Sequence, residues 1–136
     1  MGGRVINGHA GIGAPVVGIA LAARDGFSAR YDLDRDAGVF SRPGHALFGE
    51  SYVGRILVLD MAKGGVATAW MLHAMKARDL APKALLLNWA NPVMAQAAAL
   101  AGIALMDRFE TDITSAVVTG DELEVDPAGG TVRVLG

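Results

Sequence analysis

The sequence predicts an α/β fold in which two layers of strands and one layer of helices form a three-layer β/β/α domain. Two observations support this prediction. In the middle of the chain, apolar runs of strand length alternate with helical segments, which favours parallel strands joined by right-handed crossovers. Strand-rich segments flank this central part on both sides, and they indicate a second sheet or a half-barrel.

The N-terminal part of the chain is predicted to consist of short strands and loops. Apolar runs at residues 4–6, 14–17 and 18–23 are punctuated by glycines, which is typical of strands with tight turns. Residues 26–38 are dense in Asp and Gly, and they are predicted to form a loop or a hairpin. Val39 and Phe40 begin a short strand that ends before Pro43.

The central segment carries the clearest signals. Residues 54–60 form a continuous apolar run, which predicts a strand buried on both faces. A loop at 61–67 leads to a predicted helix at 68–79, with Thr68 as a candidate N-cap. The apolar face of this helix is predicted to contain Trp70, Met71 and Met75.

The remaining elements follow from similar patterns. A second buried strand is predicted at residues 84–87, and a helix follows from Asn91-Pro92 to Ala101, where Gly102 ends it. A third strand is predicted at 103–106. Residues 121–135 alternate around a Gly-rich turn and predict a terminal hairpin.

Composition excludes several classes of protein. The 136 residues have the length of one domain, and we expect a single domain over residues 1–136. Apolar residues make up 52% and charged residues 19%, which is typical of a folded chain. The net charge is −2 without a basic block, so we expect no nucleic-acid partner. Cysteine is absent and the three histidines lack metal-ligand spacing, so we expect no metal site.

One stretch has the length of a membrane span. Residues 84–106 carry no charged side chain and are long enough to cross a bilayer. The polar residues Asn88 and Gln96, and the breaker pair Asn91-Pro92, are costly in lipid. We therefore expect no membrane contact and a cytoplasmic location.

The loop Lys63-Gly64-Gly65 is the first candidate for function. It lies between a buried strand and a helix start, at the sheet edge where α/β folds bind ligands. Glycine allows an anion to approach the backbone, and Lys63 could add a charge-assisted bond to a carboxylate or phosphate. The alternative is a turn that needs glycine for its geometry, with Lys63 in solvent.

Two further segments have open interpretations. A mixed-charge loop is formed by Arg30, Asp32, Asp34, Arg35 and Asp36. It is interpreted as a solvated loop or as a polar rim at a subunit contact, although buried carboxylates there could do acid–base work. Trp89 follows a buried strand, and it belongs either to the core or to a contact surface.

Several segments, in order and spacing, resemble the aconitase X swivel domain family. Residues 42–59, Arg-Pro-Gly-His-Ala-Leu-Phe-Gly-Glu-Ser-Tyr-Val-Gly-Arg-Ile-Leu-Val-Leu, are similar to the family's His-Pro-Leu-Tyr-Gly-Gln-Ser-Ile-Ala-Gly-Lys-Ile-Leu stretch. Phe27, Asp32 and Gly38 fall where the family has Phe-Trp-Gly-Gly-Val-Asp-Pro-Glu-Thr-Gly. The glycine loop, residues 81–87 and residues 91–95 extend the resemblance over nearly the whole chain.

The resemblance implies a swivelling β/β/α fold like the mobile domain of aconitase, and a function in a two-chain hydro-lyase. It implies a large partner subunit that holds an iron–sulfur cluster and most of the active site, while this small subunit closes over a hydroxy-carboxylate substrate. Family activities are dehydration of cis-3-hydroxy-L-proline and of 5-phosphomevalonate. In isolation, the partner-facing surface is expected to expose an apolar patch or to be masked in a homo-oligomer.

The sequence departs from the family in the glycine loop. The family's Gly-Arg-Gly-Ser-Ser-Thr-Gly-Ser falls on residues 62–69, where Lys63 keeps the charge but Gly65 and Val66 replace both central serines. A swivel-domain serine is the implied base of aconitase-like enzymes, so Thr68 is the remaining hydroxyl candidate for catalysis. The alternatives are a different substrate, a base from the partner, or a non-catalytic interaction module. A phosphohistidine-type carrier would need a loop histidine, which is missing here.

Overall fold

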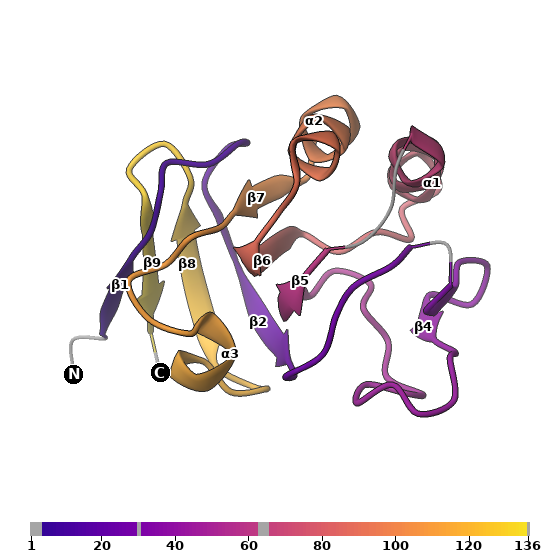
Figure 1. Cartoon of the computed structure of the whole chain (residues 1–136), viewed down its shortest axis with the longest axis horizontal. Coiled ribbons are helices and arrows are strands. Elements are labelled where there is room, and N and C mark those ends of the chain that lie inside the picture. Colours follow the sequence, from indigo (N-terminus) through magenta and orange to yellow (C-terminus); the bar gives the residue numbers. More distant parts are fainter. Residues whose placement is uncertain (1–3, 30, 63–65, 136) are drawn as a thin grey trace.

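The computed structural model describes residues 4–29, 31–62 and 66–135. Within these residues, seven strands form one sheet in the order β1-β9-β8-β2-β5-β6-β7 (Figure 1). The strands of this sheet are β1 (Val5–Asn7), β2 (Val16–Ala22), β5 (Ile56–Met61), β6 (Ala84–Trp89), β7 (Ala104–Met106), β8 (Glu122–Asp126) and β9 (Thr131–Val134). The other elements are the strand pair β3 (Leu33–Asp34) and β4 (Val39–Phe40), and the helices α1 (Val66–Ala77), α2 (Pro92–Ala101) and α3 (Ile113–Ala116).

The large sheet has a parallel and an antiparallel half, and β2 belongs to both. On one side, β2, β5, β6 and β7 run parallel, as the strand–helix alternation predicts. On the other side, β2 pairs antiparallel with β8 of the terminal hairpin, and β9 pairs antiparallel with β1. The predicted hairpin is therefore confirmed, and it extends the parallel sheet across β2.

The sheet curls so that its far edge meets the segment after β1. Ile12 and Leu105 of β7 exchange two backbone hydrogen bonds of 2.9 Å. Gly11 permits this approach, because a Cβ at that position would lie only 2.0 Å from the carbonyl oxygen of Leu105. The strand-rich flanks, expected to form a second sheet or a half-barrel, thus continue the parallel strands in one curled sheet.

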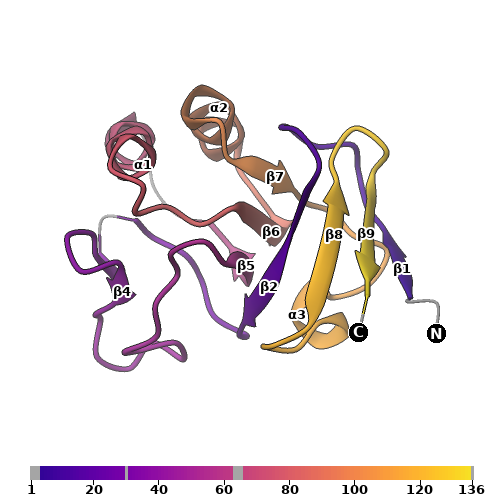
Figure 2. The same ribbon diagram turned by 180° about the vertical axis from the view of Figure 1, so that it is seen from behind.

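The parallel strands are buried on both faces. In β5, Leu57 and Leu59 pack in the core beneath the helices, whereas Ile56 and Val58 pack in a second core against the antiparallel half. Helices α1 and α2 lie on one side of these strands, and the antiparallel strands fold away from them (Figures 1 and 2). The predicted three-layer β/β/α architecture is thus confirmed.

Helix α1 differs from its prediction in position and in its buried face. It begins at Val66, so Thr68 lies in the first turn and is not the N-cap. The buried residues are Thr68, Leu72 and Met75, at helical spacing, while Trp70 is 71% exposed. The predicted apolar face is confirmed at Met75, which is buried, and at Met71, which is partly buried, but it is wrong at Trp70. The described part of the chain contains no helix long and apolar enough to span a membrane.

Other predicted boundaries are partly confirmed. Asn91 caps α2 by accepting a 2.8 Å hydrogen bond from the Met94 amide, and Gly102 ends the helix with φ of 70°. The predicted turn at Gly18 is wrong, because β2 is one continuous strand in which Gly18 pairs with Leu123. A Cβ at Gly18 would come within 3.2 Å of the Ile56 side chain, so the glycine serves close packing instead of a turn.

Candidate functional site

The carboxyl ends of the parallel strands meet at one edge of the sheet, which is where such folds bind ligands. Beyond β2, the chain continues alongside β5: the Asp60 amide donates to the Asp25 carbonyl (2.9 Å), and the Phe27 amide donates to the Met61 carbonyl (2.9 Å). Trp89 at the end of β6 pairs with Met61. The segment at residues 25–27 therefore lies beside the end of β5.

The predicted anion-binding residues Lys63, Gly64 and Gly65 lie outside the described residues. Their flanks are described: Ala62 is buried and forms a bridge with Phe27, and Val66 begins α1. Thr68 is 2% exposed in the first turn of that helix. The connection between β5 and α1 thus starts at the carboxyl edge, as predicted.

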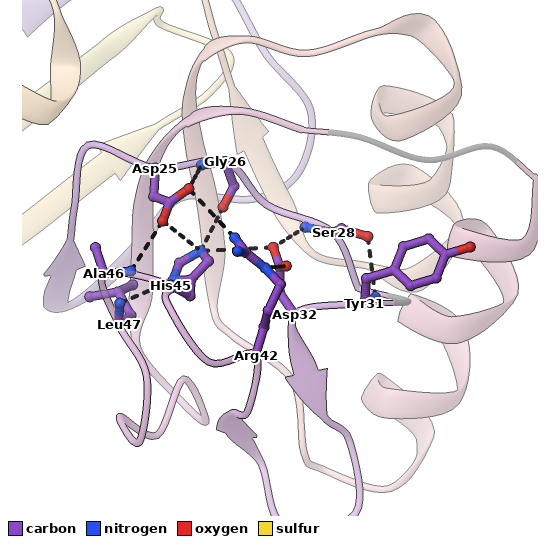
Figure 3. Close-up of polar contacts among 9 residues, drawn as sticks. All are labelled: Asp25, Gly26, Ser28, Tyr31, Asp32, Arg42, His45, Ala46 and Leu47. Atoms are coloured by element: carbon purple, nitrogen blue, oxygen red, sulfur yellow. Dashed lines mark hydrogen bonds and ion pairs between the residues drawn. The ribbon is translucent and has the colours of Figure 1, made fainter.

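A network of charged side chains occupies the same edge (Figure 3). The buried Asp32 carboxylate accepts hydrogen bonds from the Ser28 amide (2.9 Å) and from Arg42 Nε (2.5 Å). Arg42 Nη2 also lies 3.7 Å from Asp25 Oδ1. Asp32 is only 4% exposed, so the guanidinium compensates a carboxylate that burial would otherwise penalise.

His45 lies at the centre of this network. Its side chain is fully buried and its ring stacks on Phe40, with centroids 4.7 Å apart. The Leu47 amide donates to Nδ1 (3.0 Å), so Nδ1 carries the lone pair. Nε2 therefore carries the hydrogen and donates it to the Gly26 carbonyl at 2.8 Å. Both ring nitrogens are satisfied by backbone groups.

The network shifts the ionisation of two of its members. Burial of Asp25 opposes its ionisation, but hydrogen bonds from the Ala46 and Gly26 amides and the nearby Arg42 charge outweigh this, and its pKa is lowered. The hydrogen bond from Arg42 to Asp32 raises the pKa of the guanidinium. The charged forms of both side chains are therefore favoured at neutral pH.

The carboxylates of the mixed-charge loop differ in their surroundings. Asp36 is exposed and pairs with Arg78 at 2.7 Å, as expected of a solvated segment, and this contact lowers its pKa. Asp32 instead turns inward to its contacts with Ser28 and Arg42. Arg30 lies outside the described residues.

A second cluster of polar side chains holds α3 against the ends of β5 and β6. Asn88 Nδ2 donates to Asp60 Oδ1 (2.9 Å) and to Asp112 Oδ1 (2.8 Å), and its own oxygen accepts from the Ile113 amide (2.9 Å). Asp112 caps α3. Hydrogen bonds from the Thr114 hydroxyl and Asn88 lower the pKa of Asp112 to about 2. These hydrogen bonds join α3 to the ends of β5 and β6. No group of three His, Cys, Asp or Glu side chains suited to a metal ion occurs within residues 4–29, 31–62 and 66–135.

Exposed apolar side chains occur at the end of β6 and on the helical layer. Trp89 is 41% exposed, which favours the contact-surface interpretation over a core position. Helices α1 and α2 form a groove of about 460 Å³ between them. Val66, Trp70 and Leu100 line this groove and are each at least 70% exposed. Such a surface is typical of a protein contact.

Comparisons with known proteins agree over most of the length of the chain. A family described as the aconitase X swivel domain matches residues 5–134. The phosphomevalonate dehydratase small subunit of Methanocella arvoryzae is 29% identical over 95% of this chain and 98% of its own length. The protein of the same name from Methanopyrus kandleri is 32% identical over 88% of both chains. A chain of the holo-form of Thermococcus kodakaraensis aconitase X superimposes with a TM-score of 0.90 at 26% identity, covering 98% of this chain and 100% of that one.

We predict that Asp112 stabilises the fold in a pH-dependent way. Replacing the N-cap in Asp112→Ala should lower the free energy of unfolding by about 1 kcal/mol at pH 6. Because folding lowers the pKa of Asp112 from 3.8 to about 2, its contribution is complete above the unfolded pKa and is lost as the pH falls toward 2.

Urea denaturation of both proteins at pH 6 and at pH 2.5 measures this effect. The difference between wild type and Asp112→Ala should shrink at the lower pH, whereas Glu50→Ala, at an exposed carboxylate, should change little at either pH. A difference that stays constant with pH would contradict the assignment.

Proposed function

Because this chain belongs to the aconitase X swivel domain family, we propose that it is the small, swivelling subunit of a hydro-lyase that is active only with a large partner subunit. The observation that supports this most strongly is the agreement of sequence and fold from end to end. The chain matches almost the whole length of relatives named small subunits, and all of one chain of an aconitase X structure.

The substrate we propose is a small hydroxy-carboxylate whose hydroxyl lies β to the carboxylate. The relatives are named for phosphomevalonate, and cis-3-hydroxy-L-proline is the example expected from the family resemblance. In both molecules the hydroxyl is on the carbon next to the one that bears the carboxylate arm. Loss of water then removes a proton that the carboxylate group acidifies, together with that hydroxyl.

We assign the iron–sulfur cluster to the large subunit. This chain has no cysteine, so it offers none of the thiolates that usually hold such clusters. The residues of this chain do not fit the cluster, and we assign them no step that involves it. We also place the assembled enzyme in the cytoplasm, where cysteine thiolates stay reduced.

The carboxyl edge of the sheet is the surface that we propose faces the substrate. Lys63, Gly64 and Gly65 would hold a substrate anion by charge and by backbone amides. Thr68 would transfer a proton. The exposed Trp89 at this edge, and the apolar groove between α1 and α2, support a contact with another protein.

The assignment is tested by purifying the tagged chain from its native cells. We expect a larger, cysteine-bearing chain and iron to co-purify in a brown complex that dehydrates phosphomevalonate or cis-3-hydroxy-L-proline. Activity with only one of the two compounds would identify the substrate. A chain that emerges alone and colourless would overturn the enzyme assignment in favour of a non-catalytic interaction module.

We predict that Lys63→Ala weakens transition-state binding in the assembled complex. Loss of one charge-assisted contact costs about 1.5–3 kcal/mol, which corresponds to a fall in kcat/KM of roughly 10- to 150-fold. Steady-state kinetics should show this fall, while Lys76→Ala, at an exposed position in the last turn of α1, should keep the wild-type rate. An unchanged rate in Lys63→Ala would exclude Lys63 from the site.

The role of Thr68 is tested with two conservative variants. Thr68→Val removes only the hydroxyl and should lower kcat by about 10²- to 10⁴-fold if that group transfers a proton. Thr68→Ser keeps the hydroxyl and should retain most of the activity. Thermal unfolding of both variants separates catalysis from the packing of this buried residue. Full activity in Thr68→Val would show that the partner supplies the base.

A further inference from the structure

We propose that His45 is a positioning residue for the substrate-facing edge, acting through one hydrogen bond from Nε2–H to the Gly26 carbonyl. This bond holds the segment at residues 25–27 against the end of β5. The inference rests on the proposed function, because it names a residue on which that edge depends. His45 does not touch the substrate in this proposal, since both of its ring nitrogens are bonded to backbone groups.

The segment at residues 25–27 lies beyond the end of β2, so the ladder of that strand does not hold it. Its position depends instead on individual hydrogen bonds. The Asp25 carbonyl and the Phe27 amide are bonded to Asp60 and Met61 of β5. Gly26 lies between them, with its amide bonded to the Asp25 carboxylate at 2.7 Å and its carbonyl bonded to His45. The peptide plane that joins Gly26 to Phe27 is therefore held on one side by the imidazole, through the Gly26 carbonyl, and on the other by Met61, through the Phe27 amide.

The imidazole is rigid enough for this role. Phe40 stacks on one face of the ring with an interplanar angle of 25°, and the Leu47 amide fixes the tautomer. The Asp25 carboxylate accepts a 3.1 Å hydrogen bond from the Ala46 amide, which is a second contact between residues 25–27 and residues 45–47. Hydrogen bonds from residues 45–47 therefore fix the position of residues 25–27.

The neighbouring carboxylates do not accept a hydrogen bond from Nε2. Asp25 Oδ2 lies 3.8 Å and Asp32 Oδ2 3.7 Å from Nε2, which is beyond hydrogen-bond range. Arg42 engages both carboxylates instead. The hydrogen bond to Gly26 is thus the contact through which the ring acts on this segment.

Phe27 links the His45–Gly26 hydrogen bond to the residues proposed for catalysis. Its bridge to Ala62 connects the segment to the start of the β5–α1 connection, which leads to Thr68. A displacement of about 1 Å of a positioned group can lower a rate by about 10²-fold. We therefore expect loss of the His45–Gly26 bond to lower kcat more than it raises KM.

Two variants that are close in size separate the two hydrogen bonds of the ring. The amide nitrogen of His45→Gln reaches the position of Nε2 and keeps the donor to Gly26. The amide oxygen of His45→Asn reaches the position of Nδ1, so it keeps the acceptor for Leu47 and loses the bond to Gly26. His9→Asn, at an exposed histidine, is the control.

In the assembled complex, we expect His45→Gln to keep kcat within about threefold of wild type and His45→Asn to lose about 10- to 100-fold. Amide hydrogen exchange, followed by mass spectrometry, should show faster exchange at Phe27 and Asp60 in His45→Asn only. Equal losses of activity and protection in both variants, or wild-type behaviour in both, would overturn the proposal.

The exchange measurement also separates the two proposals. If the wild-type complex dehydrates no substrate, the proposed function fails. The exchange of the Phe27 and Asp60 amides alone would then decide the positioning role. If the wild-type complex is active and the two variants behave alike, the positioning role fails and the proposed function stands.

Discussion

Burial of β5 on both faces is the constraint on which the rest of the structure depends. Ile56, Leu57, Val58 and Leu59 are all fully buried, which requires a helical layer on one side and a second layer of strands on the other. β2 joins these layers, because it is parallel to β5 and antiparallel to β8. The carboxyl edge, where loops and charged groups gather, follows from this arrangement.

Hydrogen bonds of buried polar side chains stabilise the irregular segments at the carboxyl edge of the sheet. Asp32 and His45 are buried polar groups, and each is satisfied by named partners from another part of the chain. A buried polar group without partners costs about 1–3 kcal/mol, so these contacts select one arrangement of the connecting segments. Tyr52 shows the opposite case. Its buried hydroxyl has no partner among the described residues, and burial raises its pKa to about 12.

The sequence predicted what local patterns encode. The apolar run at residues 54–60, the cap at Asn91 and the end of α2 at Gly102 are local signals, and the structure confirms them. On α1 the prediction failed at Trp70, because a buried Thr68 and an exposed Trp70 reverse the usual preference of these residue types. The bond from His45 to Gly26 joins residues 19 positions apart through irregular segments, and no periodic pattern signals such a pairing. Helix α3 depends in the same way on Asn88 and Asp112.

The closure of the sheet at Ile12 has a consequence for how this subunit can bind another protein. At one border, Ile12 pairs with β7; at the other, the Glu110 amide donates to the Asn7 carbonyl of β1 at 2.8 Å, and the Glu110 side chain accepts from the Asn7 amide. Both outer strands are thus partly covered by the chain itself. Along the covered part of each border, a neighbouring protein would therefore meet side chains instead of an open backbone ladder.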